Sequence, residues 1–123
     1  MEIRANGKIV EVGYGPDEQV TVAHQHEVKA ALKKAILQNP VGLLVHVPLS
    51  LRQLDVSVAA FWMGGFRELA PSGFKAMAAV TASRPLSFFA SNFSKTLELV
   101  GAKVQIKVFQ DVSSAREWLE QVV

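Results

Sequence analysis

The chain has 123 residues, of which 50% are hydrophobic and 20% charged, which allows one domain with a buried core and excludes a disordered protein. Its 13 basic and 11 acidic residues leave a net charge of +2, without the large basic excess of a dedicated nucleic-acid-binding protein. The absence of cysteine excludes disulfide bonds, thiolate metal sites and cysteine nucleophiles.

Residues 1–14 are predicted to be extended chain, followed by a loop. Residues 8–14 are rich in β-branched side chains and follow the turn-forming pair Asn6-Gly7. Residues 13–18 contain the breakers of a loop, and residues 19–22 are expected to return as a short strand. The charged start has no apolar stretch after it, so we expect no secretory leader.

The first helix is predicted over residues 23–38, because apolar side chains recur there every three or four positions. Asn39-Pro40 ends it. His24 and His26 lie two positions apart near its start, whereas histidines that share a metal on a helix are four apart. We therefore expect solvent-facing histidines and no metal site.

A buried strand is predicted over residues 41–47, which are apolar except for His46. Pro48 ends the strand, and residues 50–54 then cross to a second helix. We interpret His46 as a strand histidine paired with a neighbouring side chain, rather than as a catalytic base.

The second predicted helix begins at Asp55 and runs to about Leu69, before Pro71-Ser72-Gly73. Asp55 is suited to the N-cap position, because its carboxylate can accept a hydrogen bond from the backbone N–H of Ser57 or Val58. Gly64 and Gly65 lie inside this helix, where they could allow another backbone to approach closely.

The first turns of this second helix are apolar almost all the way round. Between Val56 and Phe66 the only polar groups are the hydroxyl of Ser57 and the indole N–H of Trp62. A helix that covers a sheet needs an apolar stripe about 100° wide, and this one is wider. We interpret the excess as a surface for a partner, either another protein or a second copy of the chain. We expect the partner surface to comprise Asp55, Val56, Ser57, Val58 and Trp62.

The remaining elements are predicted to be a strand, a helix, a strand and a helix, over residues 74–81, 86–100, 104–109 and 111–120. Gly101 fits the position after the first of these helices. Ser114 and Glu117 have the spacing of a capping box in the second.

The order of elements predicts an α/β fold with a mixed, mostly parallel sheet of about four to five strands and about four helices. Within this sheet, the two N-terminal strands could pair with each other in antiparallel orientation. No repeat, linker or low-complexity segment interrupts the chain, and no run approaches the roughly 20 apolar residues of a membrane span. We therefore expect a single cytoplasmic domain over residues 1–123, with no nucleic-acid partner and no membrane insertion.

No catalytic set is recognisable in the sequence. Ser57 does not lie in a G-x-S-x-G elbow, and the sequence identifies no histidine partner for it. A Walker-type phosphate loop is also missing. We therefore expect a protein without enzymatic activity and without a cofactor.

The central segment resembles the STAS domain, the fold of anti-sigma-factor antagonists and of the cytoplasmic tails of sulphate transporters. That family has an apolar strand, a short crossing to Asp-x-Ser at a helix start, and then an apolar helix. Residues 43–47 followed by Leu54-Asp55-Val56-Ser57 are similar to this pattern. The strand, helix, strand and helix that follow Phe74 are similar to the closing part of the family, so the resemblance covers nearly the whole chain.

The resemblance implies a regulatory module with Ser57 as a phosphorylation switch. In the antagonists that this chain resembles, the unphosphorylated domain binds a kinase-like anti-sigma factor, and phosphorylation of the serine releases it. A phosphate on Ser57 would gain from the dipole of the helix N-terminus, so the fold should tolerate it. It would also place a charge of about −1.5 to −2 beside Asp55 and an apolar surface, so it should act on the interface.

An alternative is a related module that binds a small ligand such as a lipid or a nucleotide. Its pocket walls would be four aromatic residues for which core packing is the favoured interpretation, namely Trp62, Phe66, Phe88 and Phe89. Ser50 is a second candidate for modification besides Ser57.

Overall fold

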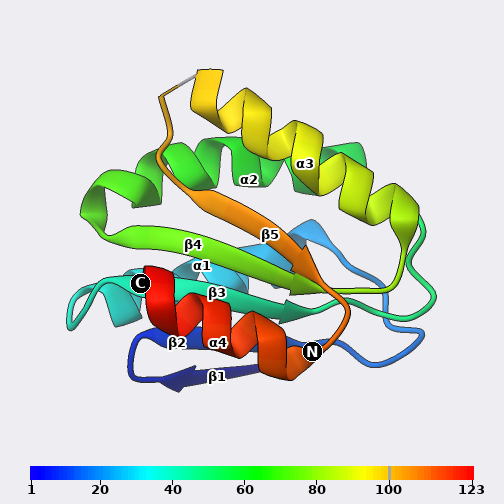
Figure 1. Ribbon diagram of the computed structural model, residues 1–123, viewed down its shortest axis with the longest axis horizontal. Helices are drawn as coiled ribbons and strands as arrows, with labels where there is room; N and C mark the ends of the chain where they lie inside the picture. The colour runs from blue at the N-terminus through cyan, green and yellow to red at the C-terminus, as the bar shows by residue number, and fades with distance from the viewer. Residues whose placement is uncertain (100) are drawn as a thin grey trace.

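The computed structural model describes residues 1–99 and 101–123, and Val100, the last residue of the helix predicted over residues 86–100, lies outside them. The described residues form a five-stranded sheet with strand order β1-β2-β3-β4-β5 (Figure 1). β1 is antiparallel to β2, and the other neighbours are parallel. The strands are β1 (Glu2–Asn6), β2 (Ile9–Gly13), β3 (Val41–His46), β4 (Phe74–Val80) and β5 (Gln105–Phe109). This confirms the predicted α/β class and the mixed, mostly parallel sheet.

Of the four α-helices in the described part of the chain, three cover one face of the sheet and the fourth covers the other (Figure 1). Because the strand order runs in one direction, right-handed crossovers place the connecting helices α1 (Val22–Ile36), α2 (Val56–Leu69) and α3 (Arg84–Leu99) on the same side. α4 (Val112–Val122) follows β5 and packs on β3 and β4 from the opposite side. A short 3-10 helix, Ala70–Ser72, follows α2.

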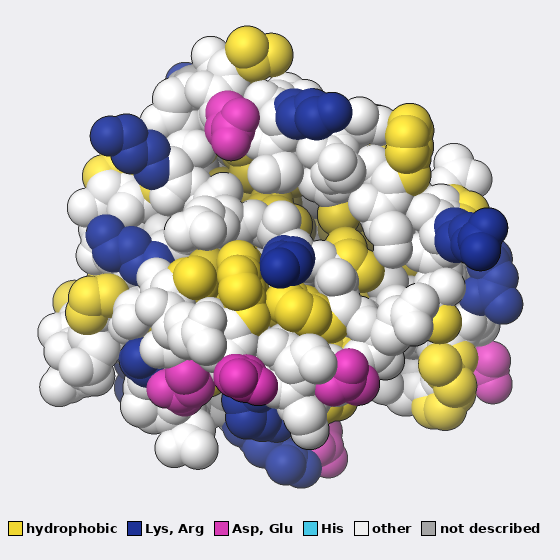
Figure 2. All heavy atoms as spheres, in the orientation of Figure 1, with side chains coloured by type: hydrophobic (Ala, Val, Ile, Leu, Met, Phe, Trp, Pro, Cys, Tyr) yellow, Lys and Arg dark blue, Asp and Glu magenta, His cyan; other side chains and the backbone are white. Residues whose placement is uncertain are grey.

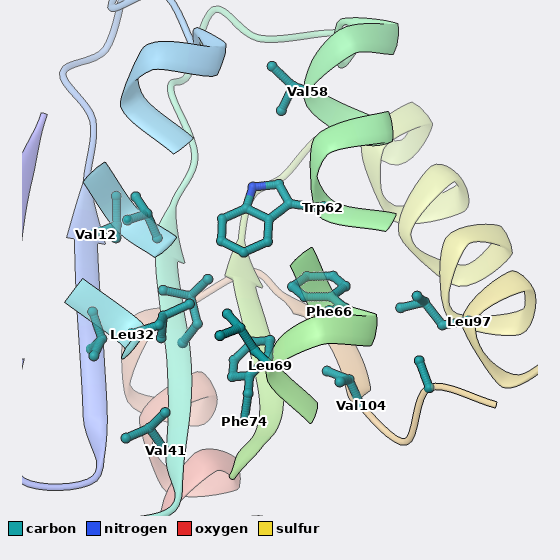
Figure 3. Packing of buried hydrophobic residues seen from close by; sticks show 14 residues of the cluster. Val12, Leu32, Val41, Val58, Trp62, Phe66, Leu69, Phe74, Leu97 and Val104 are labelled. Carbon is teal, nitrogen blue, oxygen red and sulfur yellow. The ribbon is translucent and has the colours of Figure 1, made fainter. Parts of the chain in front are cut away.

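The larger core lies between the sheet and the face formed by α1, α2 and α3. Side chains alternate along each strand, so Val10 and Val12 of β2 face these helices while Ile9 faces α4. Figure 3 shows the aromatic part of this core, in which Phe66 lies between Trp62 and Phe74, with ring centroids 5.1 Å and 5.2 Å away.

The smaller core lies under α4. Gly42 of β3 allows α4 to lie close to the sheet, since a Cβ at this position would come within 2.9 Å of the side chain of Leu119. Leu44, Ala76 and Ala78 are buried beneath the same helix. α4 is the only helix on this face among the described residues, and hydrophobic side chains remain visible in the middle of that surface (Figure 2).

Two local predictions are wrong. Residues 19–22 do not form a strand, because Thr21 is the N-cap of α1 and its Oγ1 accepts a hydrogen bond from the N–H of His24 at 3.2 Å. The capping box predicted from Ser114 and Glu117 is replaced by an N-cap at Asp111, whose Oδ1 accepts from the N–H of Ser114 at 2.8 Å.

Candidate functional site

The candidate site lies where α2 begins, at the carboxyl edge of the parallel strands. Asp55 is the N-cap, as predicted, and its Oδ1 accepts a hydrogen bond from the N–H of Ser57 at 2.8 Å. The same oxygen also accepts one from the Ser57 hydroxyl. Both residues are exposed. The hydrogen bond from the Ser57 hydroxyl is the larger cause, and the one from its backbone N–H the next, of a pKa of Asp55 below its ordinary value. The carboxylate therefore stays charged beside Ser57.

Ser57 opens onto a surface groove that we call the helix-start groove, lined by residues 17–22, 50–55, 57 and 58. The first turns of α1 and α2 both lie along this groove, because their N-caps Thr21 and Asp55 line it. Arg52 lines it as well, and its guanidinium donates to the carbonyl of Leu49 at 2.6 Å. A partner that reaches Ser57 would therefore also meet the start of α1.

The five residues predicted for the partner surface divide into two groups. Asp55, Val56 and Ser57 are exposed, Val56 at 80% of its surface. Val58 and Trp62 are 2% and 7% exposed, because the helical period turns them toward the sheet (Figure 3). The structure therefore presents Asp55, Val56 and Ser57 to solvent and holds Val58 and Trp62 beneath them.

The flanks of α2 explain part of its wide apolar surface. Phe61 packs edge-on against the ring of His26 on α1, with ring centroids 4.7 Å apart, and Lys29 lies 5.6 Å from the centroid of the same Phe61 ring. Phe66 meets Phe93 of α3 on the other side, at 5.8 Å. α2 is therefore packed below by the sheet and on both flanks by helices, and Val56 in its first turn is its one large apolar side chain that is exposed.

An apolar cavity of about 120 Å³ lies under the first turns of α2, and we call it the core cavity. Its walls include side chains of the sheet, of the segment after β3 and of α2, among them Val45, Met77, Leu51, Leu54, Val58 and Trp62. The sequence did not single out Leu51 and Leu54, although apolar residues in a short connection are a signal of packing against something.

A buried hydrogen-bonded chain lies at the edge of this cavity. The indole Nε1 of Trp62 donates to the Oε1 of Gln25 at 2.9 Å, and the Nε2 of Gln25 donates to the hydroxyl of Tyr14 at 2.8 Å. The chain joins α2 to α1 and to the loop after β2, and burial is the main reason why the pKa of Tyr14 is raised. Since these polar groups satisfy one another, the cavity presents mainly apolar surface.

The four aromatic residues of the ligand-binding alternative do not share one pocket. Three of them, Trp62, Phe66 and Phe89, line a small space of about 70 Å³ between α2 and α3. Trp62 also lines the core cavity, whereas Phe88 is 72% exposed.

The histidines contact protein side chains. His46 Nε2 lies 2.7 Å from Oε2 of Glu11, and Arg116 of α4 lies 2.8 Å from the other oxygen of Glu11, which confirms His46 as a strand histidine paired with a neighbour. His26 is exposed, whereas His24 is half-buried against the Tyr14 ring, so only His26 faces solvent as predicted.

Neither a metal cluster nor a membrane span is found in the described part of the chain. Within residues 1–99 and 101–123 there is no group of three or more side chains that could hold a metal ion. No helix among them is long and apolar enough to cross a membrane.

Comparison with known proteins places the chain in a family. A family model described as SpoIIAA-like matches residues 3–120, nearly the whole chain. No curated protein and no solved structure matches it significantly. The chain therefore belongs to the SpoIIAA-like family, which confirms the relationship to STAS-like anti-sigma-factor antagonists predicted from its sequence.

Proposed function

We propose that the protein is a cytoplasmic, non-enzymatic regulatory module that binds a kinase-like protein through the exposed surface of Asp55, Val56 and Ser57. Phosphorylation of Ser57 releases this partner. Family membership supports a regulatory fold of the anti-sigma-factor-antagonist kind. The observation that carries the proposal is the exposed Ser57 at the start of α2, with its hydroxyl donating to the Asp55 carboxylate.

The geometry supports a switch that acts on binding more than on folding. A phosphate on Ser57 lies at the positive end of the α2 dipole, which favours it, and next to the Asp55 carboxylate, which does not. It also stands beside the apolar side chain of Val56. A partner that covers Val56 must then remove water from a doubly charged group, and this desolvation weakens the complex. Val58 and Trp62 act from below by holding the first turns in place.

The chain contains its own matched control for this proposal. Asp111-Val112-Ser113 repeats the sequence Asp55-Val56-Ser57, and Asp111 is likewise the N-cap of its helix, α4. Ser113 is exposed, as Ser57 is. A negative charge at Ser113 therefore also lies beside an N-cap carboxylate at a helix start, on the opposite side of the sheet, although Asp111 accepts its hydrogen bonds from Ser114 and not from Ser113.

The test begins with phosphopeptide analysis of the protein isolated from its own cells, together with identification of the proteins that bind it. We expect phosphate on Ser57, and a kinase-like protein bound to the unmodified form only. Ser57→Asp should weaken binding of that protein at least about tenfold and shift the melting temperature by less than about 2 °C, while Ser113→Asp binds normally. Equal binding by both variants would contradict the proposal, and a large stability loss in Ser57→Asp would identify Ser57 as a structural residue.

Binding of a small apolar ligand is the second candidate function. The core cavity favours it, because the carboxyl ends of parallel strands commonly form ligand sites and the lining here is apolar. The same lining fits an apolar molecule better than a nucleotide. Native mass spectrometry of the freshly isolated protein should then detect a bound small molecule, and its removal should change the fluorescence of Trp62. A ligand-free protein with unchanged fluorescence would exclude this candidate.

A further inference from the structure

The core cavity and the helix-start groove share one wall. Four residues line both of them, namely Val20, Leu51, Leu54 and Val58. Leu54 directly precedes Asp55, and Val58 directly follows Ser57. A single layer of side chains therefore lies between the core cavity and the surface that carries the proposed switch.

Leu51 and Leu54 form the part of this shared wall that is least restrained by regular backbone structure. The sheet side, including Val45 and Met77, is held by the strand ladders. The side facing α1 is held by the hydrogen bond between Trp62 and Gln25. The connection between His46 and Asp55 is irregular, so Leu51 and Leu54 are not held by a ladder. One backbone hydrogen bond, from Ser50 N–H to the carbonyl of Pro16 at 3.0 Å, ties this connection to the loop across the groove.

The size and lining of the cavity define what it can hold. Its volume of about 120 Å³ is close to that of engineered apolar cavities of about 150 Å³, which stay dry and bind benzene or xenon. A molecule of benzene size fits with a small outward movement of the wall, and a larger apolar molecule requires a larger one. Because Leu54 and Val58 flank the Asp55–Ser57 pair, either movement shifts the first turn of α2.

We propose that the core cavity takes up a small apolar molecule and that its occupancy regulates the Ser57 surface by moving the shared wall. This inference rests on the proposed function of that surface and adds the ligand that controls it. Coupling between two sites is reciprocal, so a charge on Ser57 must in turn change the affinity of the cavity for its ligand.

The first measurement is a benzene titration of the full chain, followed by two-dimensional NMR. We expect saturable shifts in the Trp62 indole signal and in the methyl groups of Val45 and Met77. The amide signals of Val56 and Ser57 should shift along the same binding curve. Ser57→Asp should change the dissociation constant for benzene at least about fivefold, while the matched Ser113→Asp leaves it unchanged.

Two cavity-filling variants serve as controls. Ala79 of β4 and Ala90 of α3 both line the cavity, and Ala79→Leu or Ala90→Leu should abolish the saturable shifts by occupying the space. Two variants are used because overpacking at one of the two positions could unfold the protein. Shifts that survive in a folded filling variant would show that benzene binds elsewhere and would overturn the proposal.

The outcomes separate this inference from the proposed function. Saturable shifts at Trp62 without shifts at Val56 and Ser57 would overturn the regulation, and no saturable shift at all would overturn the ligand site. Neither result affects the proposed switch, which is tested separately by measuring partner binding of Ser57→Asp. Normal partner binding by Ser57→Asp, together with coupled benzene shifts, would instead overturn the proposed switch alone.

Discussion

At the scale of single residues, two hydrogen-bonded carboxylates lie on opposite sides of the sheet. Asp55 accepts hydrogen bonds from the backbone and hydroxyl of Ser57 on the side of the three helices. Glu11 lies on the α4 side, between His46 and Arg116. The pKa of each carboxyl is lowered by its hydrogen-bond donors, so both remain ionised in mild acid.

Glu11 is expected to make the free energy of unfolding depend on pH in the acid range. The hydrogen bond from Arg116, with a further one from His46, lowers its pKa below 4.5 in the folded protein, although burial opposes this. As pH falls, Glu11 binds a proton in the unfolded chain before it does so in the folded protein. The stability that Glu11 contributes is therefore fully present above its unfolded pKa, and it is lost as the pH falls through the lower pKa of the folded protein. Glu11→Gln should therefore flatten the acid limb of the unfolding free energy, measured by urea titrations between about pH 7 and about pH 3.

Arg116→Gln is the companion to this experiment, because it removes the largest cause of the shift. The pKa of Glu11, followed by NMR, should rise toward its ordinary value. An unchanged pKa in this variant, or an unchanged acid limb in Glu11→Gln, would show that the contacts of Glu11 do not stabilise the folded state.

At the scale of elements, α2 combines a buried and an exposed glycine in adjacent positions. A Cβ on Gly65 would lie 3.1 Å from Cε3 of Trp62, whereas a Cβ on Gly64 would meet nothing within 4 Å. Gly65 therefore makes room for the Trp62 ring, and the expected approach of another backbone is not needed to explain it.

The two glycines give a matched pair of stability predictions. Gly64→Ala should raise the free energy of unfolding by up to about 1 kcal/mol, because alanine is the better helix former. Gly65→Ala should lose that gain or destabilise the protein, because the Trp62 ring must move. Urea titrations of both variants, with Trp62 fluorescence, would check this. An equal gain in both variants would show that the ring adapts without cost.

The helix α2 also shows what the sequence could predict and what it could not. Its start, its N-cap and its end followed from Asp55, the apolar period and Pro71, all of which act locally. The inward direction of Val58 and Trp62 depends on where the sheet lies, and the apolar flanks depend on α1 and α3. Neither relation is local, so the sequence overestimated how much of the apolar surface of the helix is exposed, and it did not reveal the cavity.

The prediction of local structure was wrong at two places where two sequence patterns favoured different structures. The β-branched residues of segment 19–22 favoured a strand, but Thr21 is also a good N-cap, and the helix that follows decided the outcome. At α4, the spacing of Ser114 and Glu117 suggested one cap while Asp111 supplied the stronger one.

At the scale of the whole molecule, the sheet is shared by two separate cores. Trp62 belongs to the core under α1, α2 and α3, and Trp118 packs on Phe109 on the α4 side, with ring centroids 5.6 Å apart. Because both cores are built on the same strands, they should unfold together.

The two tryptophans allow this cooperativity to be measured. In Trp118→Phe the fluorescence of Trp62 reports the larger core, and in Trp62→Phe the fluorescence of Trp118 reports the smaller one. Within each variant, the fluorescence midpoint in urea should coincide with that of the far-UV circular dichroism. If the fluorescence midpoint of Trp118 lies at a lower urea concentration than the circular-dichroism midpoint, α4 detaches before the sheet unfolds.

The strand order has a consequence for how the chain can emerge from a ribosome. Each new strand from β2 to β5 joins the edge left by the one before it, so the growing sheet can extend without rearrangement. α4 alone must travel back from that edge to lie on β3 and β4. Until it has been translated, Leu44, Ala76 and Ala78 lack their cover. Nascent chains that stall before α4 would therefore expose a flat apolar face, the kind of surface that chaperones bind.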